Sequence, residues 1–205
     1  MLFYQTVHQG TLELLKELMP LPAIQNYYLV GGTALSLQAG HRISIDLDLF
    51  THIEFDANHL LESLKLNFTP HPISIGSNSL TVEINQVKVD FIRHNYPLIV
   101  PVQIIDNIRL LSMEDIAAMK LNSITTRGSK KDFYDLHELL RHFSIGQLFE
   151  FFCKKYDATL LFTVLKSLTY FDDADAEPAP VLIKKAEWDT VKQTIVSEVQ
   201  KYSGI

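Results

Sequence analysis

The sequence predicts an α+β protein in which strands and helices are mixed in the first half and only helices follow. Short β-rich runs and helical patterns alternate up to residue 110, whereas every segment after Ser112 has helical periodicity. The chain has 205 residues, 47% of them hydrophobic, which is enough for a sizeable core without disulfides. We therefore expect a core over residues 1–110 and a helical C-terminal region over 111–205.

The first half predicts three helices and four strands, bounded by glycine or polar turns. The helices are expected over 11–19, 33–40 and 56–66, and the strands over 26–30, 42–50, 79–84 and 87–94. Gly40 is the expected end of the second helix, because glycine readily adopts the left-handed conformation found there. The last two strands flank Asn85-Gln86, so we expect a hairpin although its turn lacks the usual glycine.

The second half predicts successive helices, several of which open on a serine N-cap. These helices are expected over 112–127, 129–143, 144–156, 158–171 and 186–202. The acidic, proline-containing segment "DDADAEPAP" (172–180) is expected to be a disordered or mobile loop.

Composition limits the function classes. The single cysteine, Cys153, excludes an internal disulfide, and the N-terminus lacks a signal-peptide pattern. No apolar run approaches the roughly 18 residues of a membrane span, so we expect a soluble, cytoplasmic protein with no membrane partner. The net charge of −6 argues against a broad electrostatic footprint on nucleic acid and leaves room for a local basic patch.

Three aspartates form the candidate metal site. In "IDLDL" the side chains of Asp46 and Asp48 share one face of a strand, and Asp90 follows the same alternation on a later strand. If these strands are neighbours, each carboxylate pair about 4 Å apart would repel by roughly 4 kcal/mol at an effective dielectric near 20. A magnesium ion, held by carboxylates and substrate phosphates, would relieve that repulsion. Solvated aspartates at a strand end are an equally plausible interpretation of the spacing alone.

A glycine pair precedes these aspartates. Gly31 and Gly32 lie between a strand and a helix, where bare backbone can approach a phosphate and Thr33 can cap the helix or contact the phosphate. A plain turn is the more frequent interpretation of such a pair. The combination of motifs is more specific than either motif alone. An apolar residue followed by Gly-Gly is separated by thirteen residues from Asp-Leu-Asp-Leu, and a further aspartate follows on a later strand. This order resembles the signature of polymerase-β-type nucleotidyltransferases.

Within that superfamily, "GGTALSLQAGHRISIDLDLF" followed by "MEDIAAMKLNSITTRGSKKDFYDLHELL" resembles the AbiEii/AbiGii toxin family. The resemblance implies a nucleotidyltransferase-type mixed sheet with flanking helices, followed by a helical C-terminal region. It also implies nucleotide transfer from a nucleoside triphosphate to an acceptor, which in relatives can be a tRNA end, and a partner antitoxin. By the same resemblance, Gly31 and Gly32 form the phosphate-approach turn, Asp46 and Asp48 bind Mg²⁺, and Asp90 serves as base or third metal ligand.

The second motif supplies basic and acidic candidates. The resemblance assigns Lys120 to phosphate binding, although an exposed helix lysine is the alternative from the residues alone. The basic set expected to hold a triphosphate or an RNA end comprises Arg42, Arg127, Lys130 and Lys131. Asp132 and Asp135 match the family's "KD..DL" pattern, and Asp132 also suits the first turn of a helix. His41 is a local hydrogen-bonding residue or a secondary site residue.

Two other functions remain open on the sequence. A nucleotidyltransferase fold can serve as a non-catalytic nucleotide-binding module, but all three carboxylates are present here. Transfer to a small molecule such as an aminoglycoside would suit the acidic net charge, whereas the basic residues at 127–131 suit an RNA end.

Overall fold

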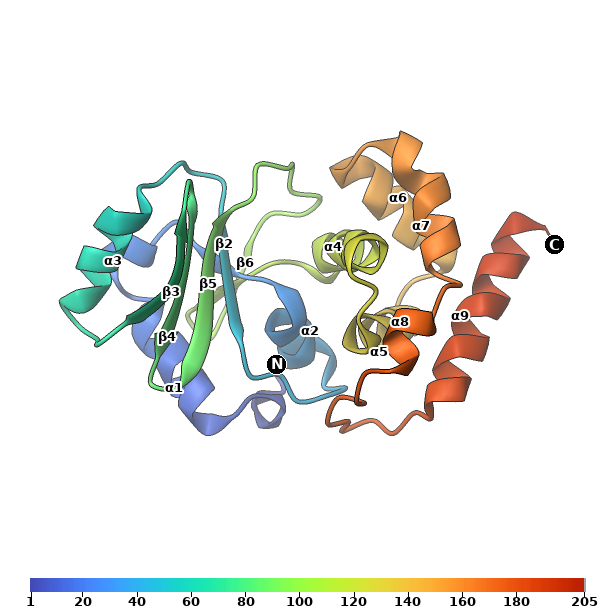
Figure 1. The fold of residues 1–205 in the computed structure, drawn as a ribbon, viewed down its shortest axis with the longest axis horizontal. Coiled ribbons are helices and arrows are strands. Elements are labelled where there is room, and N and C mark those ends of the chain that lie inside the picture. Colours follow the sequence, from blue (N-terminus) through green and yellow to red (C-terminus); the bar gives the residue numbers. More distant parts are fainter. Residues whose placement is uncertain (205) are drawn as a thin grey trace. The chain divides into compact units, whose positions relative to one another are not determined.

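The computed structural model describes residues 1–204 and divides them into two compact units. The first unit comprises residues 1–38, 43–96 and 101–111. The second comprises residues 39–42, 97–100 and 112–204, so it takes two short segments from the first half of the chain. Figure 1 shows both units as ribbons, and each is described here by itself.

A mixed sheet forms the centre of the first unit, as predicted. Its strands, in chain order, are β1 (Tyr28–Leu29), β2 (Leu47–Thr51), β3 (His71–Gly76), β4 (Ser79–Ile84), β5 (Val87–Arg93), β6 (Gln103–Ile105) and β7 (Ile108–Leu110). Their order across the seven-stranded sheet is β3-β4-β5-β2-β1-β7-β6. The pairs β2/β5 and β1/β7 are parallel, and the other neighbours are antiparallel. Figure 1 shows β3, β4, β5 and β2 side by side.

Two hairpins turn without glycine. Asn85 and Gln86, between β4 and β5, both have positive φ (52° and 63°), as do Asp106 and Asn107 between β6 and β7 (51° and 64°). Two left-handed residues in succession suit the right-handed twist of the flanking strands. The hairpin predicted at Asn85-Gln86 is therefore confirmed, and the second hairpin was not predicted.

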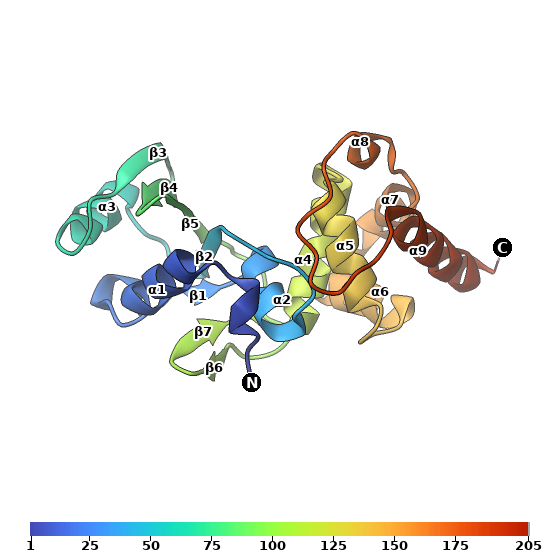
Figure 2. The same cartoon turned by 90° about the horizontal axis from the view of Figure 1, so that it is seen from below.

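Helices flank this sheet and alternate apolar positions fill its core. The helical elements of the unit are η1 (Tyr4–Thr6), α1 (Gln9–Leu18), η2 (Pro22–Ile24), α2 (Gly31–Ala39) and α3 (Ala57–Lys65). Helix α3 packs against β3 and β4, and Figure 2 shows it beside those strands. Leu47 and Leu49 on β2 are fully buried, whereas Asp48 between them is half-buried. The strand predicted from residue 42 begins only at Leu47, because Arg42 and Ser44 make isolated bridges elsewhere.

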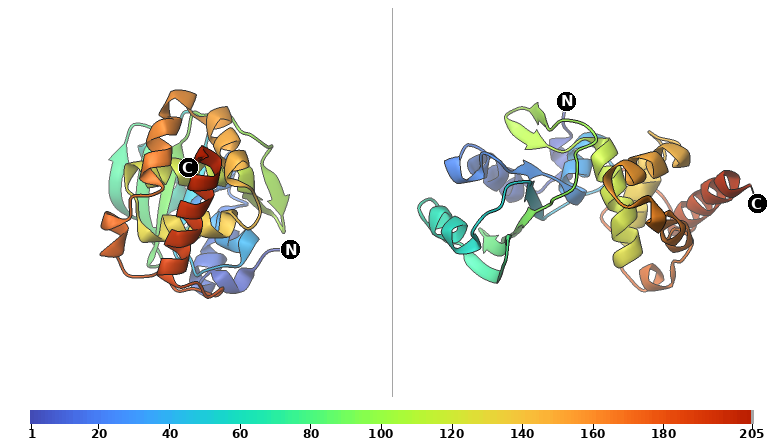
Figure 3. Two further views of the ribbon diagram at one scale, coloured as in Figure 1. Left: turned by 90° about the vertical axis from the view of Figure 1, so that its right-hand side faces the viewer. Right: turned by 90° about the horizontal axis from the view of Figure 1, so that it is seen from above.

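The second unit is helical. Its elements are α4 (Met113–Thr126), α5 (Lys130–Leu139), α6 (Ile145–Lys155), η3 (Ala158–Leu160), α7 (Leu161–Ser167), α8 (Asp172–Asp175) and α9 (Trp188–Ser203). Helix α4 packs against α5, α6 and α7, and α9 packs against α5 and α6. Figure 3 shows these helices in yellow to red.

Serine N-caps open two of these helices as predicted. The Ser112 side chain accepts a hydrogen bond from the Asp115 amide, and Ser144 forms a capping box with Gln147. Ser129 also precedes a helix, but its hydroxyl donates to Glu177 instead of capping.

The acidic segment 172–180 was predicted to be a disordered or mobile loop, and the first four of its residues are helical instead. Residues Asp172–Asp175 form α8, and the Asp175 carboxylate accepts hydrogen bonds from Trp188 and Lys192 of α9. The counter-charges that order this segment are distant in the sequence, which a local pattern does not reveal.

Candidate active site

Two neighbouring strands bring the candidate carboxylates level with each other. In the parallel pair β2/β5, the register places Asp48 directly beside Asp90. Laterally paired residues on adjacent strands project from the same face, about 4.8 Å apart. Asp46 is the residue immediately before β2, and Asp48 is the second residue of that strand. Both residues are half-buried. The convergence expected from the strand pattern is thus present for Asp48 and Asp90 at the level of the backbone.

Both oxygens of Asp90 are engaged. The Thr81 hydroxyl, on β4, donates to Oδ1 at 2.6 Å, and the Lys88 ammonium donates to Oδ2 at 2.7 Å. Thr81 and Asp90 are register partners, so these contacts follow from the sheet itself. Alternation along β5 puts Lys88 on the same face as Asp90, but neither Lys88 nor Thr81 was predicted to be a site residue. That alternation was the signal available for Lys88.

The donor set suits a hard cation. Carboxylate oxygens are the ligands that Mg²⁺ prefers. One of these carboxylates, that of Asp90, already has a cationic neighbour, because the Lys88 ammonium is 2.7 Å from its Oδ2. Among residues 1–204, no three His, Cys, Asp or Glu side chains are gathered closely enough to enclose a metal. A metal site formed by Asp46, Asp48 and Asp90 together therefore stays a prediction.

The glycine turn lies against Asp48. Gly31 has a φ of +67°, and a Cβ on it would lie 2.2 Å from Asp48 Oδ2. The Val30 amide also donates to the Asp48 carbonyl at 2.9 Å. Glycine is required here both by its conformation and by this close approach. Gly32 and Thr33 continue the first turn of α2 and are buried.

Thr33 holds the backbone before β2. Its hydroxyl contacts the Asp46 carbonyl at 2.5 Å and the Ser44 hydroxyl at 2.8 Å. Thr33 is 1% exposed, so this arrangement ties α2 to the segment that carries the two aspartates. A contact between Thr33 and phosphate stays a prediction.

A buried charged cluster lies in the second unit, around Asp135 of α5. Arg42 donates from Nε to Oδ1 at 2.6 Å and from Nη2 to Oδ2 at 2.9 Å, and His41 Nε2 lies 2.7 Å from Oδ1. Lys120 of α4 lies 2.6 Å from Oδ2. Asp135 and its three partners are each less than 6% exposed at the side chain.

The same cluster extends to Asp132. Lys120 donates to its Oδ1 at 2.9 Å, and Arg127 donates from Nε and Nη2 to the two oxygens at 2.7 and 2.9 Å. Arg127 is 54% exposed at the side chain. Lys131 is also exposed, while Lys130 is buried and donates to the carbonyls of Asp175 and Glu177. The predicted basic set is therefore split: Arg127 and Lys131 reach the surface, and Arg42 and Lys130 do not.

Burial and opposite charges act against each other on the pKa values in this cluster. Burial raises the pKa of Asp135, but the charges of Arg42 and Lys120 together with hydrogen bonds hold it well below its ordinary 3.8. Burial likewise raises the pKa of Asp132, and Lys120 and Arg127 lower it overall. The pKa of Lys120 falls with burial and rises overall because of Asp135 and Asp132. Lys120 is thus a buried, charged lysine, and the alternative of an exposed helix lysine is wrong.

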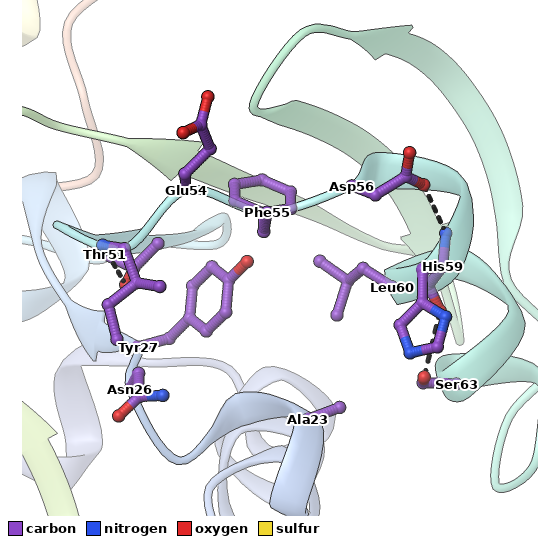
Figure 4. Close-up of a pocket in the computed structure, with 11 residues that line it drawn as sticks. Ala23, Asn26, Tyr27, Thr51, Glu54, Phe55, Asp56, His59, Leu60 and Ser63 are labelled. Carbon is purple, nitrogen blue, oxygen red and sulfur yellow. Dashed lines mark hydrogen bonds between the residues drawn. The ribbon is translucent and has the colours of Figure 1, made fainter.

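A cavity of about 500 Å³ lies elsewhere in the first unit and is not this site. It is lined by residues from η2, the end of β2 and α3, and Figure 4 shows Tyr27, Phe55 and Leu60 around it. Thr51, at its edge, lies three residues from Asp48 on β2 and therefore points to the opposite face of the sheet. The buried Tyr27 hydroxyl has no hydrogen-bond partner among the described atoms, and burial raises its pKa.

A mixed sheet with level carboxylates on two central strands, and a glycine turn against one of them, is the arrangement expected of a nucleotidyltransferase. Comparison with known proteins agrees with this class. The model of the nucleotidyl transferase AbiEii toxin family, of type IV toxin–antitoxin systems, matches residues 13–203. The chain belongs to this family and is a nucleotidyltransferase-family enzyme.

Similar proteins match this chain over nearly its whole length. An uncharacterized protein of Aquifex aeolicus (strain VF5) is 33% identical over 196 residues, which cover 93% of this chain and 94% of that protein. A candidate nucleotidyltransferase of Helicobacter pylori is similar in structure, with a TM-score of 0.60, 20% identity and 95% of each chain covered. MenT4, a nucleotidyltransferase toxin of Mycobacterium tuberculosis H37Rv, has a TM-score of 0.55 at 15% identity, with 92% of this chain and 82% of MenT4 covered. The two structures show that the fold is shared.

None of the helices in residues 1–204 has the length and apolar character that crossing a bilayer requires.

Proposed function

We propose that this protein is a magnesium-dependent toxin that transfers a nucleotide from a nucleoside triphosphate to an RNA end, with tRNA as the acceptor. The observation that carries the proposal is the register of β2 and β5, which sets Asp48 level with Asp90. The exposed Arg127 and Lys131 supply local positive charge for the RNA, although the net charge of the chain is −6.

Asp46, Asp48 and Asp90 would hold the metal, and the glycine turn at Gly31 would let phosphate oxygens approach. Mg²⁺ bound there would neutralise the phosphates and stabilise the attacking and leaving oxygens. The acceptor hydroxyl attacks the α-phosphorus, the bond to the bridging oxygen breaks, and pyrophosphate leaves. Asp90 would serve as the base that orients or accepts the hydroxyl proton, or as a metal ligand.

Lys120 is the predicted phosphate-binding lysine. Its ion pairs with Asp132 and Asp135 keep it charged. A phosphate group would compete with these carboxylates for the same ammonium, because phosphate oxygens are strong acceptors.

The decisive experiment incubates the full chain with Mg²⁺ and each labelled triphosphate, in separate reactions containing total tRNA or an aminoglycoside. Label on tRNA that disappears in Asp48→Asn supports the proposal. Glu62→Gln is the matched control, because it removes an exposed carboxylate on α3 that pairs with Lys65. Label on the aminoglycoside instead of tRNA would assign the small-molecule reaction, and triphosphate binding without any transfer would assign the binding module.

Growth provides the cellular test. Capping a tRNA end removes the hydroxyl that aminoacylation needs, so expression should arrest growth, and Asp48→Asn should restore it. An antitoxin partner would be identified by co-expression that relieves the arrest. Normal growth with acquired aminoglycoside resistance would contradict the tRNA proposal.

A further inference from the structure

Lys88 lies among the three candidate metal-binding carboxylates. Its ammonium is 2.7 Å from Asp90 Oδ2, while Thr81 occupies Oδ1. Lys88 precedes Asp90 by two residues on β5, so both side chains project from one face. The register of β2 and β5 pairs Asp48 with Asp90 and Leu47 with Val89. Continued by one residue beyond the start of β2, the same register would pair Asp46 with Lys88. Lys88 therefore contacts Asp90 and projects from the sheet face that Asp90 shares with Asp48.

The ion pair of Lys88 with Asp90 brings a positive charge to the candidate metal site. The Lys88 side chain is 48% exposed, whereas that of Asp90 is 13% exposed, so the lysine can swing toward solvent while the carboxylate stays in place.

We propose that Lys88 is a positioning residue that holds the Asp90 carboxylate in the metal-free protein and competes with the divalent cation for it. The inference rests on the proposed function, because it takes these aspartates as the metal site. An ammonium and a hard cation seek the same carboxylate oxygens, so the entering cation must displace the ammonium from Asp90 Oδ2. Lys88 thereby sets the metal affinity of the site and limits repulsion among the carboxylates when no metal is bound.

The test measures Mn²⁺ affinity directly, without nucleotide, from the electron paramagnetic resonance signal of free Mn²⁺. Lys88→Gln should bind Mn²⁺ about three- to tenfold more tightly than the unmodified protein, since a competing and repelling charge is lost. Lys88→Met should behave in the same way. Lys88→Arg keeps the charge and should bind no more tightly than the unmodified protein. Lys65→Gln, which removes an exposed lysine paired with Glu62, should leave the affinity unchanged.

The outcomes separate the inference from the proposed function. If Lys88→Gln and Lys88→Met bind Mn²⁺ with unchanged or weaker affinity while Asp48→Asn binds it poorly, the metal site stands and the competition is refuted. If neither the unmodified protein nor these variants bind Mn²⁺ at millimolar concentration, the metal site is refuted and the inference with it. Tighter binding in Lys88→Arg as well would show that positive charge at this position does not limit the affinity, which also refutes the inference.

Discussion

The guanidinium of Arg42 binds both carboxylate oxygens of Asp135, 93 residues later in the chain, at 2.6 and 2.9 Å. Such a fork places two charge-assisted hydrogen bonds in one fixed geometry. Because both side chains are buried, neither group has water as a substitute partner. The pair joins the short segment 39–42 to the helical unit to which it belongs.

Removing Asp135 should therefore destabilise the protein strongly. Asp135→Ala leaves Arg42 and Lys120 as buried cations without this carboxylate, and breaking such a pair costs about 3–5 kcal/mol. Urea unfolding monitored by circular dichroism measures the change. Glu198→Gln, which breaks an exposed pair with Lys201, should change the free energy of unfolding by less than about 0.5 kcal/mol. Equal effects of the two substitutions would contradict a stabilising role for the buried cluster.

Acid should weaken the same cluster. The pKa values of Asp132 and Asp135 are lower in the folded protein than their ordinary 3.8, so the unfolded chain binds protons first as the pH falls. Their contribution to stability is complete above the unfolded pKa and is lost as the pH drops below about 3.8 toward the folded values. Urea unfolding at pH 6, 4 and 3 should show this loss, and Asp135→Asn should lessen its pH dependence. An identical pH dependence in that variant would be evidence against the assignment.

Gly31 and Gly10 form a matched pair of glycine substitutions. Gly31→Ala strains a φ of +67° and drives a Cβ to within 2.2 Å of Asp48 Oδ2, so it should lower stability by more than about 1 kcal/mol and abolish transfer. Gly10 lies in α1 with no atom within 4 Å of the added Cβ. Gly10→Ala should therefore raise stability by up to about 1 kcal/mol and leave activity unchanged. Melting curves and nucleotide transfer distinguish the two sites.

Asp48→Asn should separate activity from stability. The substitution removes one of two like charges that the register sets side by side, so stability should be unchanged or higher. Loss of a metal ligand should slow transfer at least about 100-fold, since metal-assisted charge stabilisation contributes several kcal/mol. Thermal melting and single-turnover kinetics provide the two measurements. A variant that unfolds would contradict the expected relief of repulsion, and a folded variant that retains full activity would remove Asp48 from the proposed site.

Lys120→Ala tests the predicted phosphate contact. Because Lys120 is buried, its removal leaves the carboxylates of Asp132 and Asp135 without this buried partner. We therefore expect the free energy of unfolding to fall by about 3–5 kcal/mol. Binding of a non-hydrolysable triphosphate, measured by calorimetry at a temperature where the variant is folded, should also weaken. Unchanged affinity in a folded variant would assign Lys120 to structure alone.

The sequence predicted what short-range patterns specify. Alternation in "SLTVEI" and "VKVDFIRH" identified β4 and β5, and the helical periodicities identified the main helices. Strand β3 was missed because every residue in His71–Gly76 is exposed, so the edge strand shows no buried face. Strands β6 and β7, at three residues each, are too short for alternation to be recognised.

Long-range pairing limited what could be predicted for the site. Alternation put Asp46 and Asp48 on one face, but only the register of β2 and β5 shows that Asp48 is level with Asp90. The burial of Arg42 and Lys120 depends on Asp135, which matched a motif whose structural role was left open. Buried ion pairs of this kind produce no periodic pattern in the sequence. The sequence therefore identified the basic residues but did not show which of them are buried and which reach the surface.

The parallel pairing of β2 with β5 also determines when the proposed site comes into existence during folding. A chain segment of about forty residues separates Asp48 from Asp90, and its ends must meet before the two carboxylates share a surface. Strand β2 gains this neighbour only after β5 has been synthesised, so a nascent chain that ends at the β4/β5 turn carries Asp46 and Asp48 without their partner. If Asp48 and Asp90 act together as proposed, nucleotide transfer requires the folded sheet, and an unfinished chain that ends before β5 lacks the activity.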